Sequence, residues 1–390
     1  MSDTEACGLL EQALAQGGTA SALDRLESVL RDKGDFWGWF YARLMRARTA
    51  MGACPTPTAG STDLTPAQQE QYEQAIRESA HLVGGTALEQ GLLEQAWPFY
   101  KLLGDAQPIR NALIQFKAED DGDWDTPIRL AFYEGLLPVD GYGWILARYG
   151  LCNAITALSQ GEIPSHPDDR KACIRQLTRA LHHELTGRLT ADLARQQGRE
   201  PTAEETAPMA PGRLPALLDA NPDLTAEDVY HIDLSHLQST VQLAGGMGPC
   251  PELDLACELC DYGSRLKGRF APRGETPFDP FFVGWRHYLE AIAGRDAESH
   301  INHFREAARA GAEEGNTYPS EVLHRLLETI GREAEALEAA VTCQSPQSLR
   351  ERCQKVGDFR PMIRAARLQG DPVHFLAACL EQERLGKPRA

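Results

Sequence analysis

The sequence has few of the residues that build β-sheets. Its 390 residues include only 10 Val and 13 Ile, against 47 Leu and 51 Ala. Strands favour β-branched and aromatic side chains, whereas Leu and Ala favour helices. This composition argues against sandwiches, barrels and large parallel sheets, and it predicts an all-α chain with little or no strand.

Long apolar runs are absent as well. No stretch approaches the roughly 18 consecutive apolar residues of a membrane helix, so we expect no membrane span. Residues 1–8 contain two acidic residues, no basic residue and no apolar core, which is unlike a signal peptide. Both absences predict a cytoplasmic protein.

Positive charge is scarce. The chain has 39 Lys and Arg against 56 Asp and Glu, a formal net charge of −17, and this balance disfavours a nucleic-acid partner. The motifs GxxxxGK[ST], GxGxxG after a strand and GxSxG are also missing, so nucleotide-dependent and α/β-hydrolase chemistries have no support. A protein, a peptide or a small molecule is the expected partner.

The ten cysteines do not follow the spacing of a disulfide scaffold, and we expect them to be reduced. Cys257 and Cys260 form a single CxxC on a helical pattern with apolar neighbours. Zinc ribbons need a second pair of ligands, so this pair is interpreted as two thiols in the core.

Two short signatures recur and predict repeated helical hairpins. In one, a glycine is followed five residues later by a small residue, with a helical pattern on both sides. In the other, a Gly-Asp pair places glycine at the end of one helix and aspartate at the start of the next. The pairs are Gly17/Ala22, Gly91/Ala96, Gly294/Ser299, Gly331/Ala336, Gly34-Asp35, Gly104-Asp105, Gly357-Asp358 and Gly370-Asp371.

Helical hairpins of unequal length are the unit of an irregular α-solenoid of the tetratricopeptide-like kind. The loop-rich stretch 198–225 is the best boundary, between an N-terminal helical-repeat half over 1–197 and a C-terminal half over 226–390. Because solenoids lack independent cores, this stretch is either a linker or a long loop within one array.

The segment 230–237 is the strongest candidate for chemistry. His231, Asp233 and His236 fall within six residues at the start of a helical pattern. With His182 from a facing helix, the histidines would form a site for a divalent transition metal such as zinc. The alternative is a helix capped by Asp233 with structural histidines.

Polar residues also interrupt the apolar sequence RYGLCNAIT at 148–156. A buried Asn needs hydrogen-bond partners, so Cys152 and Asn153 predict a polar interior network. Cys152 as a nucleophile would take His182 or His231 as its base. Cys152, Asn153 and Asp233 are therefore the candidate catalytic residues.

Two further groups are interpreted mainly as structural. His300 and His303 share a helix face, with His287 nearby in a looser group. Aromatic clusters at 37–41, 97–100 and 281–288 are typical of packing between repeats, and the alternative is that some of them line a ligand groove.

Several segments resemble a group of tetratricopeptide-like helical-repeat proteins from planctomycete-type bacteria. They are ALDRLESVL…FYARLMRAR, QAWPFYKLLGD, RYGLCNAIT, YHIDLSHL and DYGSRL, which span about residues 20–310. The chain departs from the tetratricopeptide pattern by lacking a regular 34-residue consensus. The resemblance implies a helical-repeat fold in a bacterial cytoplasm, and it transfers no catalytic residue.

The sequence leaves two functions open. The first is a helical-repeat binding or scaffold protein that holds a peptide, a protein segment or a small ligand in a concave groove. The second is an all-helical metal-dependent enzyme with His182, His231, Asp233 and His236 between the two halves. The positions of the His231 and His236 rings distinguish them.

Overall fold

The computed structural model describes residues 3–58, 63–117, 122–160 and 166–386. Over these ranges the chain consists of α-helices and short π- and 3₁₀-helical turns, without a β-strand. The all-α class predicted from the scarcity of Val and Ile is therefore confirmed. None of the helices in these ranges combines the length and apolar character required to cross a bilayer.

The chain divides into two compact units, Met1–Trp144 and Ile145–Ala390. The division falls inside the helix α7 (Pro138–Ser159). The first unit also contains α1 (Asp3–Asp32), α2 (Phe36–Ala50), α3 (Pro66–Glu89), α4 (Leu93–Leu103), α5 (Gln107–Ile114), α6 (Asp125–Ile128) and the π-helical turn Arg129–Tyr133.

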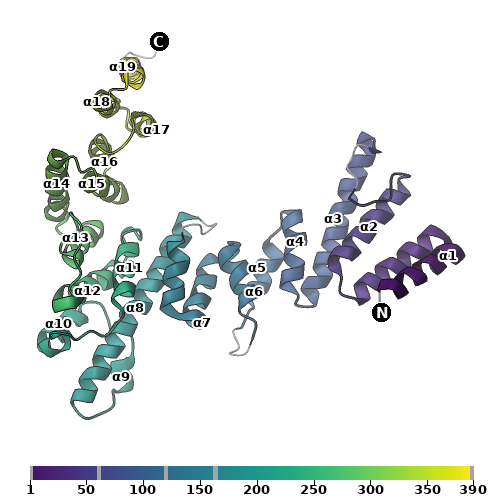
Figure 1. Ribbon diagram of the computed structural model, residues 1–390, viewed down its shortest axis with the longest axis horizontal. Helices are drawn as coiled ribbons and strands as arrows, with labels where there is room; N and C mark the ends of the chain where they lie inside the picture. Colours follow the sequence, from purple (N-terminus) through teal and green to yellow (C-terminus); the bar gives the residue numbers. More distant parts are fainter. Residues whose placement is uncertain (1–2, 59–62, 118–121, 161–165, 387–390) are drawn as a thin grey trace. The chain divides into compact units, whose positions relative to one another are not determined.

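Helices of the first unit pack against their neighbours in the chain, α1 on α2, α2 on α3 and α3 on α4 (Figure 1). Trp37 and Phe40 of α2 meet Phe99 of α4, with ring centroids 4.7 and 5.5 Å apart. Phe40 and Phe99 are buried in the core of this unit. The aromatic clusters at 37–41 and 97–100 thus pack between helices, as predicted.

The second unit contains the remaining helices. From α12 to α19 each helix packs against the next, in the order in which they follow from green to yellow in Figure 1. They are α8 (Pro167–Gln196), α9 (Ala203–Thr206), α10 (Arg213–Ala220), α11 (Leu234–Ala244), α12 (Glu252–Arg265), α13 (Phe281–Ala293), α14 (Ala297–Glu314), α15 (Tyr318–Thr329), α16 (Glu333–Ala340), α17 (Pro346–Val356), α18 (Arg360–Gln369) and α19 (Pro372–Gly386).

The long helix α8 departs from this order. It packs against α11 and α12, which follow the stretch 198–225 predicted as a linker or long loop. Helices on both sides of that stretch therefore share one compact unit, and the stretch connects parts of it. The halves predicted over 1–197 and 226–390 differ from the observed units for this reason.

Most of the glycines in the two predicted signatures lie at the ends of helices. Seven of the eight have a φ between 65° and 77°, the left-handed region that favours glycine. In the remaining pair Gly18 (φ 70°), rather than Gly17, interrupts α1. The aspartates that follow Gly accept hydrogen bonds from amides at the start of the next helix, in the bonds Gly38 N–Asp35, Gln107 N–Asp105, Arg360 N–Asp358 and Val373 N–Asp371.

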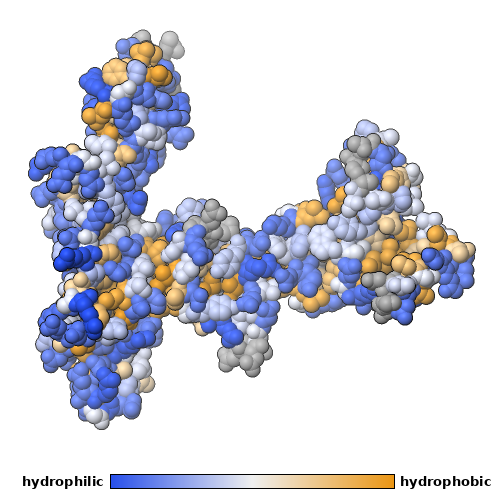
Figure 2. Space-filling view, viewed as in Figure 1, coloured by the Kyte–Doolittle hydropathy of each residue, from blue (hydrophilic) through white to orange (hydrophobic). Residues whose placement is uncertain are grey.

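The last helix carries apolar side chains at the surface. Val373, Leu376 and Leu380 of α19 are 73, 58 and 58% exposed, and Figure 2 shows orange atoms over this end of the second unit. These residues lie on one face of the helix, because their spacing is three and four residues.

Candidate functional site

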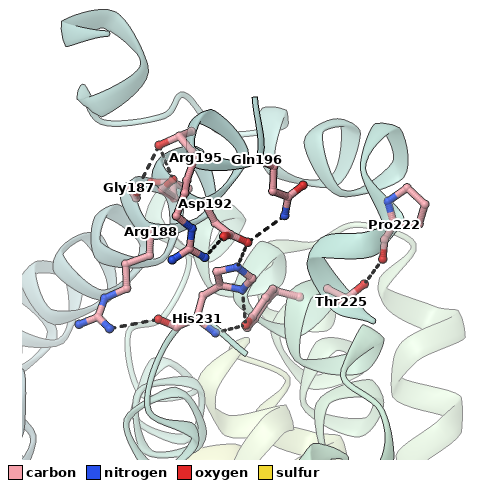
Figure 3. A network of polar contacts seen from close by, with 11 residues as sticks. Gly187, Arg188, Asp192, Arg195, Gln196, Pro222, Thr225 and His231 are labelled. Carbon is pink, nitrogen blue, oxygen red and sulfur yellow. Dashed lines mark hydrogen bonds and ion pairs between the residues drawn. The ribbon is translucent and has the colours of Figure 1, made fainter. Parts of the chain in front are cut away.

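His231 lies in the loop before α11 and contacts both α8 and α12 (Figure 3). Its Nε2 is 3.3 Å from Asp192 Oδ2, and its Nδ1 is 3.4 Å from the Tyr262 hydroxyl oxygen. Its backbone N–H donates to the same hydroxyl at 2.9 Å, and its carbonyl accepts from Arg188 at 3.3 Å. We name these four residues the His231 cluster. Every polar group of His231 has a partner in it.

The electrostatics of the His231 cluster favour a neutral imidazole. Burial lowers the pKa of His231, and the raising effect of the Asp192 carboxylate is smaller. Burial would raise the pKa of Asp192, but hydrogen bonds from His231 and Arg195 outweigh it and lower that pKa. The hydrogen bonds fit an Nε2–H that donates to Asp192 and an Nδ1 that accepts from Tyr262. Neither ring nitrogen is left for a metal or a substrate.

A pocket of about 760 Å³ adjoins His231 and the C-terminal part of α8. Three arginines line it, but each already pairs with a carboxylate, so the pocket offers little uncompensated positive charge. The pairs are Arg188–Glu184, Arg195–Asp192 and Arg199–Glu205.

Asp233 is the N-cap of α11, as the structural alternative predicted. Its Oδ1 accepts from the backbone N–H groups of Ser235 at 2.7 Å and His236 at 3.4 Å. The hydroxyl and amide of Ser235 lower the pKa of Asp233. This carboxylate is therefore used by the backbone of its own helix.

His182 has a partner that the sequence did not reveal. It lies on the buried face of α8, where its Nε2 is 2.6 Å from Glu258 Oε2 on α12. The other Glu258 oxygen accepts from the Gly212 backbone N–H. His182 and Glu258 are 2 and 5% exposed, so this pair is an interior link between α8, α12 and the start of α10. The sequence signal that could have revealed this pair is Glu258 itself, an acidic residue on the buried side of the helix that carries the CxxC.

The predicted metal site is not assembled in the described ranges. They contain no group of three or more His, Cys, Asp or Glu side chains arranged to hold a metal ion. His182 pairs with Glu258, while His231 pairs with Asp192 and Tyr262. The two histidines therefore do not combine with His236 into one ligand set.

Cys152 and Asn153 are exposed, so the prediction that they form a buried polar network is wrong. The reason is the kink at Gly150 (φ 74°, ψ −174°) inside α7, which resets the helix face that follows. Asn153 donates to the Tyr149 carbonyl at 2.9 Å. The two histidines considered as bases for Cys152 are engaged elsewhere.

The CxxC residues are core thiols, as predicted. Cys257 and Cys260 are both buried in α12. Burial raises the pKa of Cys257 to about 12, and it raises the pKa of Cys260 well above its usual value. Buried thiols of this kind are unreactive.

Three other histidines do come together, between α13 and α14. His287 Nδ1 and His300 Nδ1 are 2.7 Å apart, and the His287 and His303 rings stack with centroids 4.7 Å apart. His303 Nε2 is 3.0 Å from the Pro277 carbonyl oxygen and takes the donor role there. Burial lowers the pKa of His287, and the neighbouring His303 and His300 add to this effect. The cluster joins two helices and the loop before α13.

A second pocket, of about 630 Å³, lies in the second unit between α8, the end of α11, α13 and α15. Four aromatic residues form much of its wall. Phe278 and Trp285 stack nearly parallel, with centroids 4.2 Å apart and ring planes 6° apart, and Tyr288 and Tyr318 stand beside them. Burial raises the pKa of Tyr288 to about 12, which keeps its hydroxyl protonated.

The charged residues of this pocket are basic. Arg170 of α8 donates to the Leu158 carbonyl at 2.9 Å, and Arg325 of α15 is exposed. Neither guanidinium has a carboxylate partner among the described residues, and no described Asp or Glu lines the pocket. We call it the aromatic–arginine pocket. Sequence reasoning missed it because Arg170, Trp285 and Arg325 are distant in the chain.

One more polar atom in the pocket wall lacks a partner. The Trp285 Nε1 is buried and makes no hydrogen bond to any described residue. Buried indole N–H groups usually find an acceptor. The guanidinium groups of Arg170 and Arg325 thus have no carboxylate partner within the described chain. The Trp285 N–H has no hydrogen-bond partner there.

Comparison with known proteins adds no relative to this description. No family model, no curated protein and no solved structure matches the chain.

Proposed function

We propose that the chain is a helical-repeat binding protein of the cytoplasm whose ligand occupies the aromatic–arginine pocket. In this proposal the helices form an irregular, tetratricopeptide-like α-solenoid, as in the bacterial proteins that the sequence resembles. The ligand is a small molecule, or a peptide whose end enters the pocket. The packing of α12 to α19 on their chain neighbours supports a repeat arrangement.

One observation carries the choice of site. Arg170 and Arg325 line a concave, aromatic surface and have no carboxylate partner among the described residues. Ligand sites are mostly apolar pockets of roughly 300–1,000 Å³ with a few polar groups that fix the ligand. The volume of about 630 Å³ and the lining residues match that description.

The metal-dependent enzyme is not favoured by any observation on the described residues. Two of its three histidines, His182 and His231, are engaged by Glu258, Asp192 and Tyr262. Its candidate nucleophile Cys152 is exposed.

The test is a screen of small ligands by ligand-observed NMR, against the parent and Gln242→Trp. Gln242 is exposed and lines the pocket, so an indole there would fill space without disturbing the core. Gln238→Trp, one turn earlier on α11 and outside the lining, is the matched control. We expect hits that bind the parent and Gln238→Trp at one saturable site and lose at least tenfold in affinity for Gln242→Trp. Equal binding to all three proteins, or no hit at millimolar concentration, would contradict the proposal.

A further inference from the structure

We propose that the ligand of the aromatic–arginine pocket is an anion with a flat apolar body, such as an aromatic carboxylate or phosphate ester. The inference rests on the proposed binding function and specifies its ligand class. It follows from the charge of the pocket, the stacking of its rings and the positions of its two arginines.

The charge of the pocket opposes that of the chain. The protein carries a net charge of −17, and its field repels anions at long range. Within the pocket, however, the ionised side chains are Arg170 and Arg325, with no described carboxylate in the lining. An anion that enters the pocket is attracted by the two guanidinium groups, and a cation is repelled by them.

The contrast with the pocket beside His231 makes this distinction sharper. That pocket has three arginines, each with a carboxylate partner within 2.7 Å or closer. An anion entering it would compete with these carboxylates. The aromatic–arginine pocket requires no such exchange.

The rings define the body of the ligand. Phe278 and Trp285 lie parallel with a centroid separation of 4.2 Å, and Tyr288 contacts Trp285 edge-on at 5.4 Å. Trp285 is half-buried and lines the pocket, so its indole offers aromatic surface against which a further flat ring packs. A flexible aliphatic chain would use this surface less well.

The arginines define the head group. Arg170 comes from α8 and Arg325 from α15, so the two guanidinium groups belong to different walls of the pocket. A guanidinium offers parallel N–H donors that match the oxygens of a carboxylate or a phosphate. Both head groups share this chemistry, and only measurement separates them.

The experiment is isothermal titration calorimetry of the full chain with four probes at 100 mM salt. They are 1-naphthoate, 1-naphthyl phosphate, the neutral 1-naphthalenemethanol and inorganic phosphate. We expect saturable binding of at least one naphthyl anion, at least tenfold weaker binding of the neutral alcohol, and no saturable binding of inorganic phosphate. The ratio of the naphthoate and naphthyl phosphate affinities identifies the preferred head group.

Two charge-reversal variants test where the anion binds. Arg325→Glu should weaken binding of the preferred naphthyl anion at least tenfold and leave binding of the neutral alcohol within twofold. Arg309→Glu, on the exposed side of α14 and outside the pocket lining, makes the same change in net charge and should leave both affinities within twofold. Because Arg325 is exposed and makes no ion pair with a described residue, its reversal should not impair folding, which circular dichroism checks.

The outcomes separate this inference from the proposed function. Equal affinities for the naphthyl anions and the alcohol, equal losses in both charge reversals, or no binding of any naphthyl probe would overturn the anionic ligand class. The binding function would still stand if other ligands lost affinity for Gln242→Trp. It would fall with the inference only if that screen also gave no pocket-dependent hit.

Discussion

The His231 cluster and the aromatic–arginine pocket both lie in the second unit and both combine aromatic, basic and hydrogen-bonding residues, yet their polar groups are used differently. In the His231 cluster, Asp192, Tyr262 and Arg188 take up every polar group of His231. In the pocket, the Arg325 guanidinium has no carboxylate partner and the Trp285 N–H has no hydrogen-bond partner among the described residues. The first region is built to hold helices together, and the second has groups left for a ligand.

The difference teaches that residue types alone do not identify a site. Histidine, aspartate and tyrosine are typical catalytic residues, but in the His231 cluster each is held by its neighbours. Whether the polar groups of a region already have partners among the described residues therefore distinguishes a structural role from a binding role. Variants in the first region should change stability, and variants in the second should change binding.

The largest expected effect is at the buried pair of His182 and Glu258. Glu258→Ala should lower the free energy of unfolding by about 3 kcal/mol, because it leaves buried His182 and the Gly212 N–H without an acceptor. Glu333→Ala, which removes only an exposed contact to Lys355, should cost less than 1 kcal/mol. Urea denaturation followed by circular dichroism measures both. Similar losses in the two variants would show that the interior pair has no structural role.

A pair of tyrosine variants compares the two regions directly. Tyr262→Phe should lower the free energy of unfolding by about 2 kcal/mol, because it leaves the backbone N–H of His231 unpaired in the interior. Tyr318→Phe removes a hydroxyl from the pocket, where Tyr318 is 37% exposed, and should cost less than 0.5 kcal/mol. The same denaturation measurement checks this order. If Tyr318→Phe were the more destabilising, the assignment of the two regions would have to be exchanged.

Local features of the fold could be predicted from the sequence because they depend on neighbouring residues. Gly357 adopts positive φ and Asp358 accepts from the next helix, and Asp233 caps α11. The helix α3 continues through Gly84 and Gly85 to Glu89. Gly84 serves close packing there, since a Cβ atom would lie 2.8 Å from Phe99 Cβ.

The candidate site was less predictable because it depends on contacts between distant residues. The pairing of His182 with Glu258 spans 76 residues, and no local pattern encodes it. The kink at Gly150 placed Cys152 at the surface, although its neighbours in sequence are apolar. Only the aromatic residues at 281–288 gave a signal for the pocket, through the alternative that they line a groove.

Acid should destabilise the fold through the buried histidines. The pKa values of His231 and His287 are lowered by burial, while the unfolded chain binds these protons near the ordinary pKa of about 6.5. Below that pH the unfolded state holds more protons than the folded state. The free energy of unfolding therefore decreases as the pH is lowered, until the pH reaches the folded-state pKa values.

Thermal unfolding at pH 7.5 and 5.5 measures this effect. The Tm of the parent should be lower at pH 5.5, and His231→Gln should show a smaller difference between the two pH values. His183→Gln, which changes an exposed histidine on α8, should keep the difference of the parent. An unchanged difference in His231→Gln would mean that the cluster tolerates a protonated imidazole.

The smallest effects are expected at the residues that the sequence singled out for catalysis. Cys152→Ser and Asn153→Ala alter exposed side chains on α7, so each should change the free energy of unfolding by less than about 0.5 kcal/mol. Both variants should also bind the preferred naphthyl anion within twofold of the parent, since neither residue lines the aromatic–arginine pocket. Denaturation and calorimetry on the same preparations check the two statements. A large loss of binding in either variant would place the ligand near α7 and transfer the binding role away from Arg170 and Arg325.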